Sequence, residues 1–267
     1  MAIDPANFPS GALEQVRGVA HEWYHRLAAL NYDRRFHSRN NSTPAGTIRC
    51  YEPITRHAND AMLSELDAVC GPTDVIVDVG AHVGIYALAL ATDEPDRRVA
   101  AFEPPSAVAD RFRANLALNG LGGRIDLHAC ALGERDGRRT FYRSSNPELS
   151  AFDRAAATRW GATVLDVRSV PVRRLDSLVT GLEPSGADAP ALDSLASPDV
   201  IKVDVEGAAP SVLRGARAVL ETDEPTVFVE RHDDGLGGNA PAETTEVMLD
   251  LSYDMRSRTG YWRFEPR

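Results

Sequence analysis

One segment of the sequence limits the possible folds more than any other. Residues 75–79 read Val-Ile-Val-Asp-Val, and a turn from Gly80 to Gly84 separates this run from an apolar stretch over 85–91. A short β-branched run is typical of a strand that is buried on both faces. Gly80 permits a tight turn, and Gly84 lets the next helix approach the strand closely. The segment predicts a strand, a turn and a helix whose first N–H groups face a polar ligand.

The same alternation continues along the chain. The sequence predicts further strands over 98–102, 125–131, 200–205, 226–230, 252–257 and 260–265, and helices over 106–119, 210–220 and 241–250. Two more strand-like pieces, 139–143 and 163–173, lie on either side of a polar loop over 144–150. Strands that alternate with helices indicate a doubly wound, mostly parallel α/β sheet of the Rossmann-like type, here with seven strands. A ligand is expected at the carboxyl ends of those strands.

The first 72 residues do not follow this alternation. Apolar residues recur at helical spacing over 12–36, and a second helical stretch covers 59–69, with a polar break over 40–46 between them. We therefore expect a helical N-terminal extension over residues 1–72 and a single α/β domain over 73–267. Within that domain, residues 182–198 are rich in Pro, Ala, Ser and Gly, which predicts a mobile insertion.

Composition excludes several classes of function. The chain has 39 acidic and 29 basic residues and a net charge of −10, and an acidic body repels the phosphates of nucleic acids. No apolar run approaches the roughly 18 residues that span a bilayer. Acid and proline stand near the N-terminus where a signal peptide needs a basic and an apolar region, so we expect a cytoplasmic protein. Lys202 is the only lysine of the chain.

An acidic residue completes the pattern around the first turn. Glu103 ends the second predicted strand, nineteen residues beyond Gly84. A carboxylate at this place accepts both hydroxyl hydrogens of a ribose. Together with the glycine turn, Glu103 indicates an adenosine-type cofactor.

Two classes of cofactor fit an adenosine site. A dinucleotide site favours a second glycine two positions after the first, because that glycine admits the pyrophosphate. Here His82 stands at that position, and its side chain would obstruct the approach. S-adenosylmethionine has no pyrophosphate, and Asp78 can pair with the ammonium group at its amino-acid end. The sequence therefore favours S-adenosylmethionine. An NAD(P)-dependent oxidoreductase and a non-catalytic nucleotide-binding module are the alternatives. A purely structural interpretation is also open, in which Asp78 only caps the turn and His82 is an ordinary loop histidine.

Three motifs resemble those of the FkbM-type methyltransferases. They are Asp78-Val-Gly-Ala-His-Val-Gly84, Phe102-Glu103-Pro104 and Ile201-Lys-Val-Asp-Val-Glu-Gly207. Two further segments, 212–216 and 225–232, extend the likeness. The family often has Asn where His82 stands, and a second acid where Ala209 stands. The resemblance implies a class I methyltransferase fold and transfer of a methyl group from S-adenosylmethionine to a hydroxyl of a sugar or natural product. The predicted cofactor-binding residues are Asp78, Gly80, Ala81, His82, Gly84, Glu103, Pro104 and Ala131.

A group of charged residues follows the last two buried strands. Lys202, Asp204 and Glu206 alternate along one strand, and Glu230 and His232 end the strand expected beside it. Buried charges are costly unless they are paired, so we expect a buried Lys202 to pair with Asp204, Glu206 or Glu230. A hydroxyl that attacks a methyl group must lose its proton, and His232 or Asp204 is the candidate base. All five are the predicted catalytic residues.

Two other interpretations of this group stay open. The five charged residues can form a purely structural ion-pair network beneath the site. The other four, Asp204, Glu206, Glu230 and His232, can also bind a magnesium-like ion together with Asp233 and Asp234, because carboxylate oxygens suit such an ion. Nothing in the spacing requires a metal, and we predict none. The acceptor is expected to be a glycan or small-molecule hydroxyl, and its specificity is expected to come from the N-terminal helices, the 144–150 loop and the 182–198 insertion.

Overall fold

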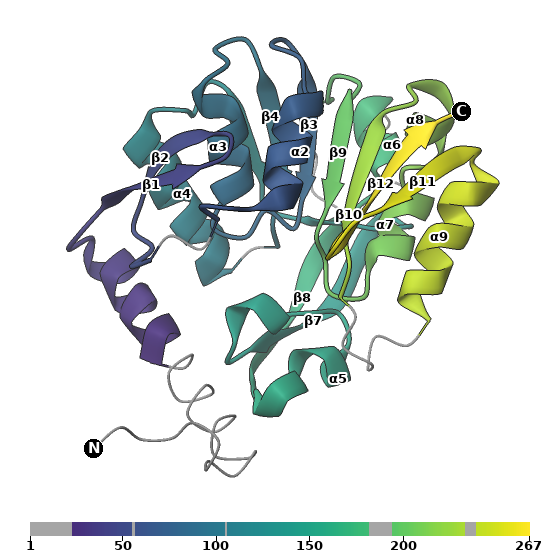
Figure 1. The fold of residues 1–267 in the computed structure, drawn as a ribbon. Coiled ribbons are helices and arrows are strands. Elements are labelled where there is room, and N and C mark those ends of the chain that lie inside the picture. The colour runs from purple at the N-terminus through teal and green to yellow at the C-terminus, as the bar shows by residue number, and fades with distance from the viewer. Residues whose placement is uncertain (1–22, 55–56, 105, 182–193, 233–238) are drawn as a thin grey trace, which may run out of the picture.

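The computed structural model describes residues 23–54, 57–104, 106–181, 194–232 and 239–267. Its centre is a seven-stranded sheet in the order β11-β12-β10-β9-β3-β4-β5, in which only β12 runs against its neighbours (Figure 1). The strands are β3 (Val75–Val79), β4 (Arg98–Phe102), β5 (Ile125–His128), β9 (Val200–Val203), β10 (Thr226–Glu230), β11 (Tyr253–Ser257) and β12 (Tyr261–Pro266). The predicted doubly wound, mostly parallel sheet of class I methyltransferases is confirmed.

Helices cover both faces of the sheet. On one face lie α2 (Ala61–Val69), α3 (Ile85–Thr92) and α4 (Ala107–Asn119), which pack on strand residues such as Ile76. On the other lie α6 (Leu175–Val179), α7 (Ala209–Arg214), α8 (Arg217–Thr222) and α9 (Ala240–Asp250), which pack on residues such as Val77. Because side chains of a strand alternate between its two faces, a strand covered twice is apolar at nearly every position.

Local signals set the helix boundaries near the site. Asp60 caps α2 by accepting the N–H of Leu63, and Ser106 caps α4 in the same manner. Helix α3 has no side-chain cap and follows directly on Gly84. Its residues 85–91 are all buried, which explains why this helix is apolar on every side.

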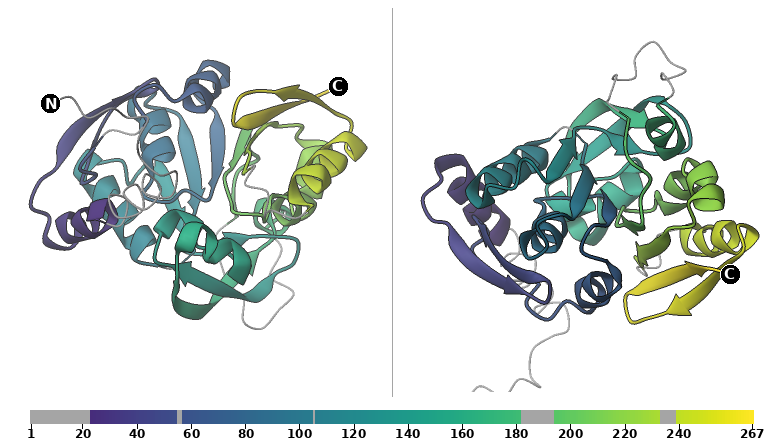
Figure 2. Two further views of the ribbon diagram at one scale, coloured as in Figure 1. Left: turned by 60° about the horizontal axis from the view of Figure 1, so that its bottom comes forward. Right: turned by 90° about the horizontal axis from the view of Figure 1, so that it is seen from above.

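The N-terminal extension contains a hairpin that the sequence analysis missed. Residues 23–34 are helical as expected, whereas residues 12–22 lie outside the described part of the chain. The predicted polar break over 40–46 is wrong: β1 (Arg39–Thr43) pairs antiparallel with β2 (Gly46–Cys50). Ile48 and Cys50 point into the core while their neighbours face solvent, and this short alternation is enough to fix the register. The hairpin and the C-terminal strands lie on opposite sides of the molecule (Figure 2).

Two predicted elements are interrupted. The strand expected over 125–131 ends at His128, and β6 (Ala131–Leu132) joins a separate sheet with β7 (Gly137–Ser144) and β8 (Val164–Arg173). The helix expected over 210–220 breaks at Gly215 into α7 and α8. A Cβ on Gly215 would lie 2.0 Å from the carbonyl oxygen of Gly133, so the loop after β6 presses on the chain at this break. Of the predicted insertion, residues 182–193 lie outside the described part.

Candidate active site

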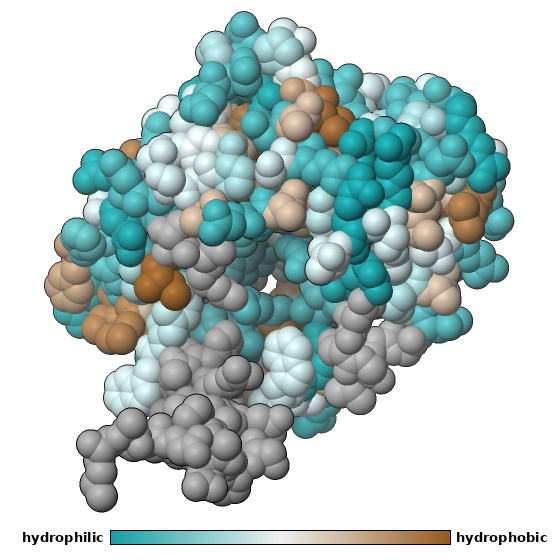
Figure 3. Space-filling model, viewed as in Figure 1, coloured by the Kyte–Doolittle hydropathy of each residue, from teal (hydrophilic) through white to brown (hydrophobic). Residues whose placement is uncertain are grey.

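A cavity of about 630 Å³ opens at the carboxyl ends of β3, β4, β9 and β10. Figure 3 shows the surface hollowed near its centre in the view of Figure 1. This is the edge at which α/β sheets bind their ligands. Most of the predicted site residues line it, namely Gly80, Ala81, His82, Glu103, Pro104, Ala131, Lys202, Asp204, Glu206, Glu230 and His232. Asp78 and Gly84 lie behind its wall.

The turn after β3 is held rigidly. The N–H groups of Gly80 and Ala81 both donate to the carbonyl of Phe102, at 3.0 and 3.1 Å. Gly80 has a φ of +77°, and a Cβ there would lie only 1.9 Å from the carbonyl oxygen of Asp204. Gly84 has a φ of +86°, and a Cβ there would lie 2.2 Å from the ring of Phe112. Both glycines are therefore required by close packing as well as by backbone conformation.

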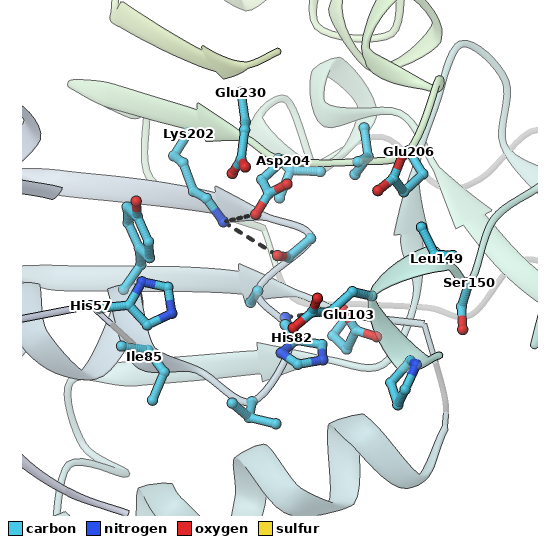
Figure 4. Close-up of a pocket in the computed structure, with 18 of the residues that line it drawn as sticks. His57, His82, Ile85, Glu103, Leu149, Ser150, Lys202, Asp204, Glu206 and Glu230 are labelled. Carbon is cyan, nitrogen blue, oxygen red and sulfur yellow. Dashed lines mark hydrogen bonds and ion pairs between the residues drawn. The ribbon is translucent and has the colours of Figure 1, made fainter. Parts of the chain in front are cut away.

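Glu103 and His82 are linked across this turn. The backbone N–H of His82, a residue with a φ of +50°, donates to Oε2 of Glu103 at 3.1 Å. The two side chains point into the same part of the cavity (Figure 4). Burial raises the pKa of Glu103 to about 8, even though the His82 N–H acts to lower it. The Glu103 carboxyl is thus held at the cavity surface by the turn that the sequence analysis singled out.

Lys202 is buried beneath the cavity, as predicted. Its ammonium lies 3.4 Å from Asp204, one of the three expected partners, but only 2.9 Å from Oδ1 of Asp78. It also donates to the carbonyl oxygen of Gly80 at 3.3 Å and lies 4.8 Å from the ring centre of Tyr86. Burial opposes its charge, yet Asp78 and Asp204 outweigh burial and raise the pKa of Lys202. Asp78 thus faces Lys202, whereas we had expected it to face the ammonium of a cofactor.

Asp204, Glu230 and His232 form a second group on the cavity wall. Nε2 of His232 lies 3.3 Å from Asp204, and Nδ1 lies 3.5 Å from Glu206. Burial acts to raise the pKa of Asp204, but Lys202 and His232 hold it below its usual range. Burial and the charge of Asp204 raise the pKa of Glu230 to about 8. Burial disfavours the charged form of His232, but its carboxylate neighbours raise the pKa of the imidazole.

A family model for the methyltransferase FkbM domain matches residues 78–255, which covers the turn, the charged group and strands β4, β5, β9 and β10. The chain belongs to the FkbM methyltransferase family. It is 32% identical over 190 residues to a 31-O-demethyl-FK506 methyltransferase of Streptomyces tacrolimicus, over 64% of this chain and 70% of that protein. It is 28% identical over 176 residues to the methyltransferase sdnD of Sordaria araneosa, over 57% of this chain and 67% of that protein.

A solved methyltransferase FkbM from Methylobacillus flagellatus is similar at 19% identity and a TM-score of 0.48, over 72% of this chain and 44% of that one. The family resemblance expected from the sequence is confirmed by the family model. Among the described residues, no helix has the length and apolar character needed to cross a membrane.

The site of this FkbM-family methyltransferase includes a buried arginine that the sequence analysis missed. Arg159 comes from the segment between β7 and β8, and its guanidinium donates to Glu206. The next residue, Trp160, lines the cavity, has a φ of +51° and is 74% exposed. The predicted 144–150 loop also contributes, since Leu149 and Ser150 line the cavity (Figure 4). Arg159 gave no local signal because its partner lies 47 residues away.

The N-terminal extension supplies a second group that the sequence analysis missed. Nδ1 of His57 lies 2.8 Å from Asp60, and the hydroxyl of Tyr86 donates to the same carboxylate at 2.8 Å. All three residues line the cavity. Asp60 is also the N-cap of α2, and this capping position before a helical stretch is the one signal by which the sequence pointed to it.

Three of the described residues offer atoms that could hold a metal ion. Ligand atoms of Asp204, Glu230 and His232 lie within 4.8 Å of one another. However, the ammonium of Lys202 already lies 3.4 Å from Asp204, where it supplies the positive charge that an ion would bring. The arrangement serves proton transfer as readily as metal binding, because it combines an imidazole with two carboxylates.

Proposed function

We propose that this enzyme transfers a methyl group from S-adenosylmethionine to a hydroxyl of a small-molecule or glycan acceptor. The observation that carries the proposal is that Glu103, the Gly80 turn and the Asp204–His232 pair all face one cavity. A ribose-binding carboxylate and a candidate base thereby share one space. The name of the Streptomyces tacrolimicus relative, which specifies an oxygen, supports the choice of a hydroxyl.

The cavity fits the proposed cofactor. Glu103 stands where a carboxylate accepts hydrogen bonds from two ribose hydroxyls. The Gly80 turn lines the same cavity, and its close packing on the carbonyl of Asp204 leaves no room for a Cβ. The wall also carries Asp204, whose carboxylate Lys202 and His232 keep ionised, and negative charge favours a positively charged sulfonium. The His82 side chain lines the cavity at the position where a dinucleotide site requires glycine. These features support S-adenosylmethionine over NAD(P).

Residues of the charged group then have separate roles in the proposed reaction. When bound, S-adenosylmethionine supplies a methyl group on an electron-poor sulfur. His232 accepts the proton of the acceptor hydroxyl, and Asp204, 3.3 Å from Nε2, stabilises the imidazolium that forms. Glu206 lies next to the other ring nitrogen, and Arg159 holds Glu206 in place. Lys202 holds Asp204 in place and favours its ionised carboxylate. Asp204 therefore does not keep the proton that the acceptor hydroxyl loses.

Replacing Glu103 with glutamine should weaken binding of S-adenosylmethionine by ~1–3 kcal/mol above pH 8, where the carboxyl is ionised, because the amide offers one acceptor atom where the carboxylate offers two. Burial raises the pKa of this carboxyl to about 8, and its ionised form is the better acceptor. Affinity of the wild type should therefore increase as the pH rises through about 8, whereas the Gln variant should lack this dependence. Calorimetric titration at several pH values measures both effects. The surface variant Glu221→Gln serves as control, and equal affinities in all three proteins would contradict the assignment.

Replacing His232 with glutamine should lower the turnover number by ~10²–10⁴-fold, the range for loss of a general base. In the wild type, the rate should increase with pH, with a midpoint above 6.5, because neighbouring carboxylates raise the pKa of His232 and only the neutral imidazole is a base. The pH profile of methyl transfer under saturating cofactor tests this. A wild-type profile that is flat between pH 6 and 9, or a His232→Gln variant that keeps the wild-type profile, would exclude His232 as the base.

The acceptor can be found by comparing metabolites. A strain that lacks the gene should accumulate a compound that is lighter by one methylene group than its counterpart in the parent strain. Incubating that compound with the purified enzyme and S-adenosylmethionine should restore the mass, and fragmentation should place the new methyl group on oxygen. A methyl group on nitrogen or carbon would contradict the proposed reaction.

A further inference from the structure

The group formed by His57, Asp60 and Tyr86 has no part in the chemistry described above. Asp60 holds it together: one carboxylate oxygen lies 2.8 Å from Nδ1 of His57, and the other accepts the Tyr86 hydroxyl and the N–H of Leu63. The rings of His57 and Tyr86 meet edge to face, with centres 5.8 Å apart. With Nδ1 held by Asp60, the imidazole has its other nitrogen, Nε2, left for a ligand in the cavity.

The position of this group relative to Glu103 indicates which part of a ligand it meets. In Figure 4, His57 and Ile85 lie to one side of Glu103, while Leu149 and Ser150 lie to the other. Leu149 on the second side is apolar, and the chain that follows β5, the strand beside β4, brings the apolar residues Ala131 and Leu132 to the cavity. An adenine suits the apolar side. If Glu103 binds the ribose, the remaining end of the cofactor lies toward His57.

That end of S-adenosylmethionine is an amino acid, which carries an ammonium and a carboxylate. Asp78 does not line the cavity, and the ammonium of Lys202 is bound by Asp78 and Asp204, so neither is available to it. His57 and Asp60 together place an imidazole nitrogen and a carboxylate at the cavity surface. Such a pair complements a zwitterion, with charge-assisted hydrogen bonds in both directions.

We propose that His57 and Asp60 bind the amino-acid end of the cofactor. His57 contacts the carboxylate of the cofactor, and Asp60 contacts its ammonium group. Tyr86 supports the pair by holding Asp60 from the start of α3. Burial acts to raise the pKa of Asp60, but hydrogen bonds with His57, Leu63 and Tyr86 lower it, which keeps its charge in place. This inference rests on the proposed function, because it assigns a subsite of the same cofactor.

A comparison of two ligands tests the subsite independently of catalysis. S-adenosylhomocysteine carries the amino-acid end, and 5′-methylthioadenosine lacks it. His57→Gln should weaken binding of S-adenosylhomocysteine by about 10- to 100-fold, the loss expected for a charge-assisted hydrogen bond, and leave the affinity for 5′-methylthioadenosine unchanged. Asp60→Asn should act in the same direction and keep the fold, since asparagine is also a good N-cap. His25→Gln, another histidine that lines the cavity, is the matched control.

The outcomes separate two kinds of failure. A wild type that binds neither ligand contradicts the proposed function itself. A wild type that binds both, with His57→Gln weakening both equally or neither, overturns only the subsite. Arg111 also lines the cavity, with its guanidinium 5.4 Å from the Tyr32 ring. If Arg111→Gln, and not His57→Gln, abolishes the preference for S-adenosylhomocysteine, then Arg111 binds the carboxylate and the inference is wrong.

Discussion

Replacing Lys202 with methionine should lower the free energy of unfolding by ~3–5 kcal/mol and reduce methyl transfer severely. The ammonium of Lys202 lies 2.9 Å from Oδ1 of Asp78, and both side chains are almost wholly buried. Removing one partner of a buried ion pair leaves the other charge without compensation. Oδ2 of Asp78 has no hydrogen-bond partner among the described residues, and Lys202 is the main group that favours the ionised form of this carboxylate. Asp204 would lose its cation as well. Urea unfolding and a methyl-transfer assay measure the two effects.

Two further variants separate charge from shape at this position. The double variant Lys202→Met with Asp78→Asn removes both charges, so it should recover a substantial part of the lost stability. Lys202→Arg keeps the charge but must fit a planar fork between Asp78, the Gly80 carbonyl and the Tyr86 ring, and it should melt below the wild type. An Arg variant with wild-type melting and wild-type turnover would show that the only lysine of the chain has no special role.

Replacing Gly80 with alanine should cost ~2–5 kcal/mol of stability and reduce cofactor binding. A Cβ at this position would lie 1.9 Å from the carbonyl oxygen of Asp204, so the backbone itself must move. About 1–2 kcal/mol of the cost comes from the left-handed conformation and ~1–3 kcal/mol from overpacking. Because Asp204 carries its carboxylate into the cavity, its displacement should also impair methyl transfer. Thermal melting and calorimetric titration check these effects.

Gly120→Ala is the matched control for this variant. Gly120 has a similar φ of +66°, but a Cβ there meets nothing within 4 Å. It should therefore show the conformational cost alone, without loss of cofactor binding. Equal effects of the two substitutions would mean that the contact between Gly80 and Asp204 does not matter.

The fold was predictable where local pattern and burial agree. Strands β3, β4 and β10 begin and end where the sequence analysis placed them, because an apolar run covered on both faces has sharp limits. The β1–β2 hairpin was missed because its strands are mostly polar and only Ile48 and Cys50 reach the core. The break at Gly215 depends on the backbone of Gly133, which no local pattern shows.

The candidate site, too, was predictable only where its residues are close together in the sequence. The turn from Gly80 to Gly84 and the acid at the end of β4 were predictable because they belong to one short strand–turn–helix unit and its neighbour. Of the two carboxylates beside Lys202, Asp204 was expected, but the closer one was not, since Asp78 and Lys202 are 124 residues apart and meet only through the parallel register of β3 and β9. The bond from Arg159 to Glu206 likewise depends on where the segment between β7 and β8 folds back.

The central claim is that the cavity around Glu103 and the Gly80 turn binds S-adenosylmethionine. Calorimetric titration of the purified protein with S-adenosylmethionine, S-adenosylhomocysteine and NAD tests this claim most directly. The account predicts saturable binding of the first two ligands, weakened in the Glu103→Gln variant above pH 8, where Glu103 is ionised, and no binding of NAD. Binding of NAD without binding of S-adenosylmethionine, or binding of S-adenosylmethionine that is unaffected by Glu103→Gln, would contradict it.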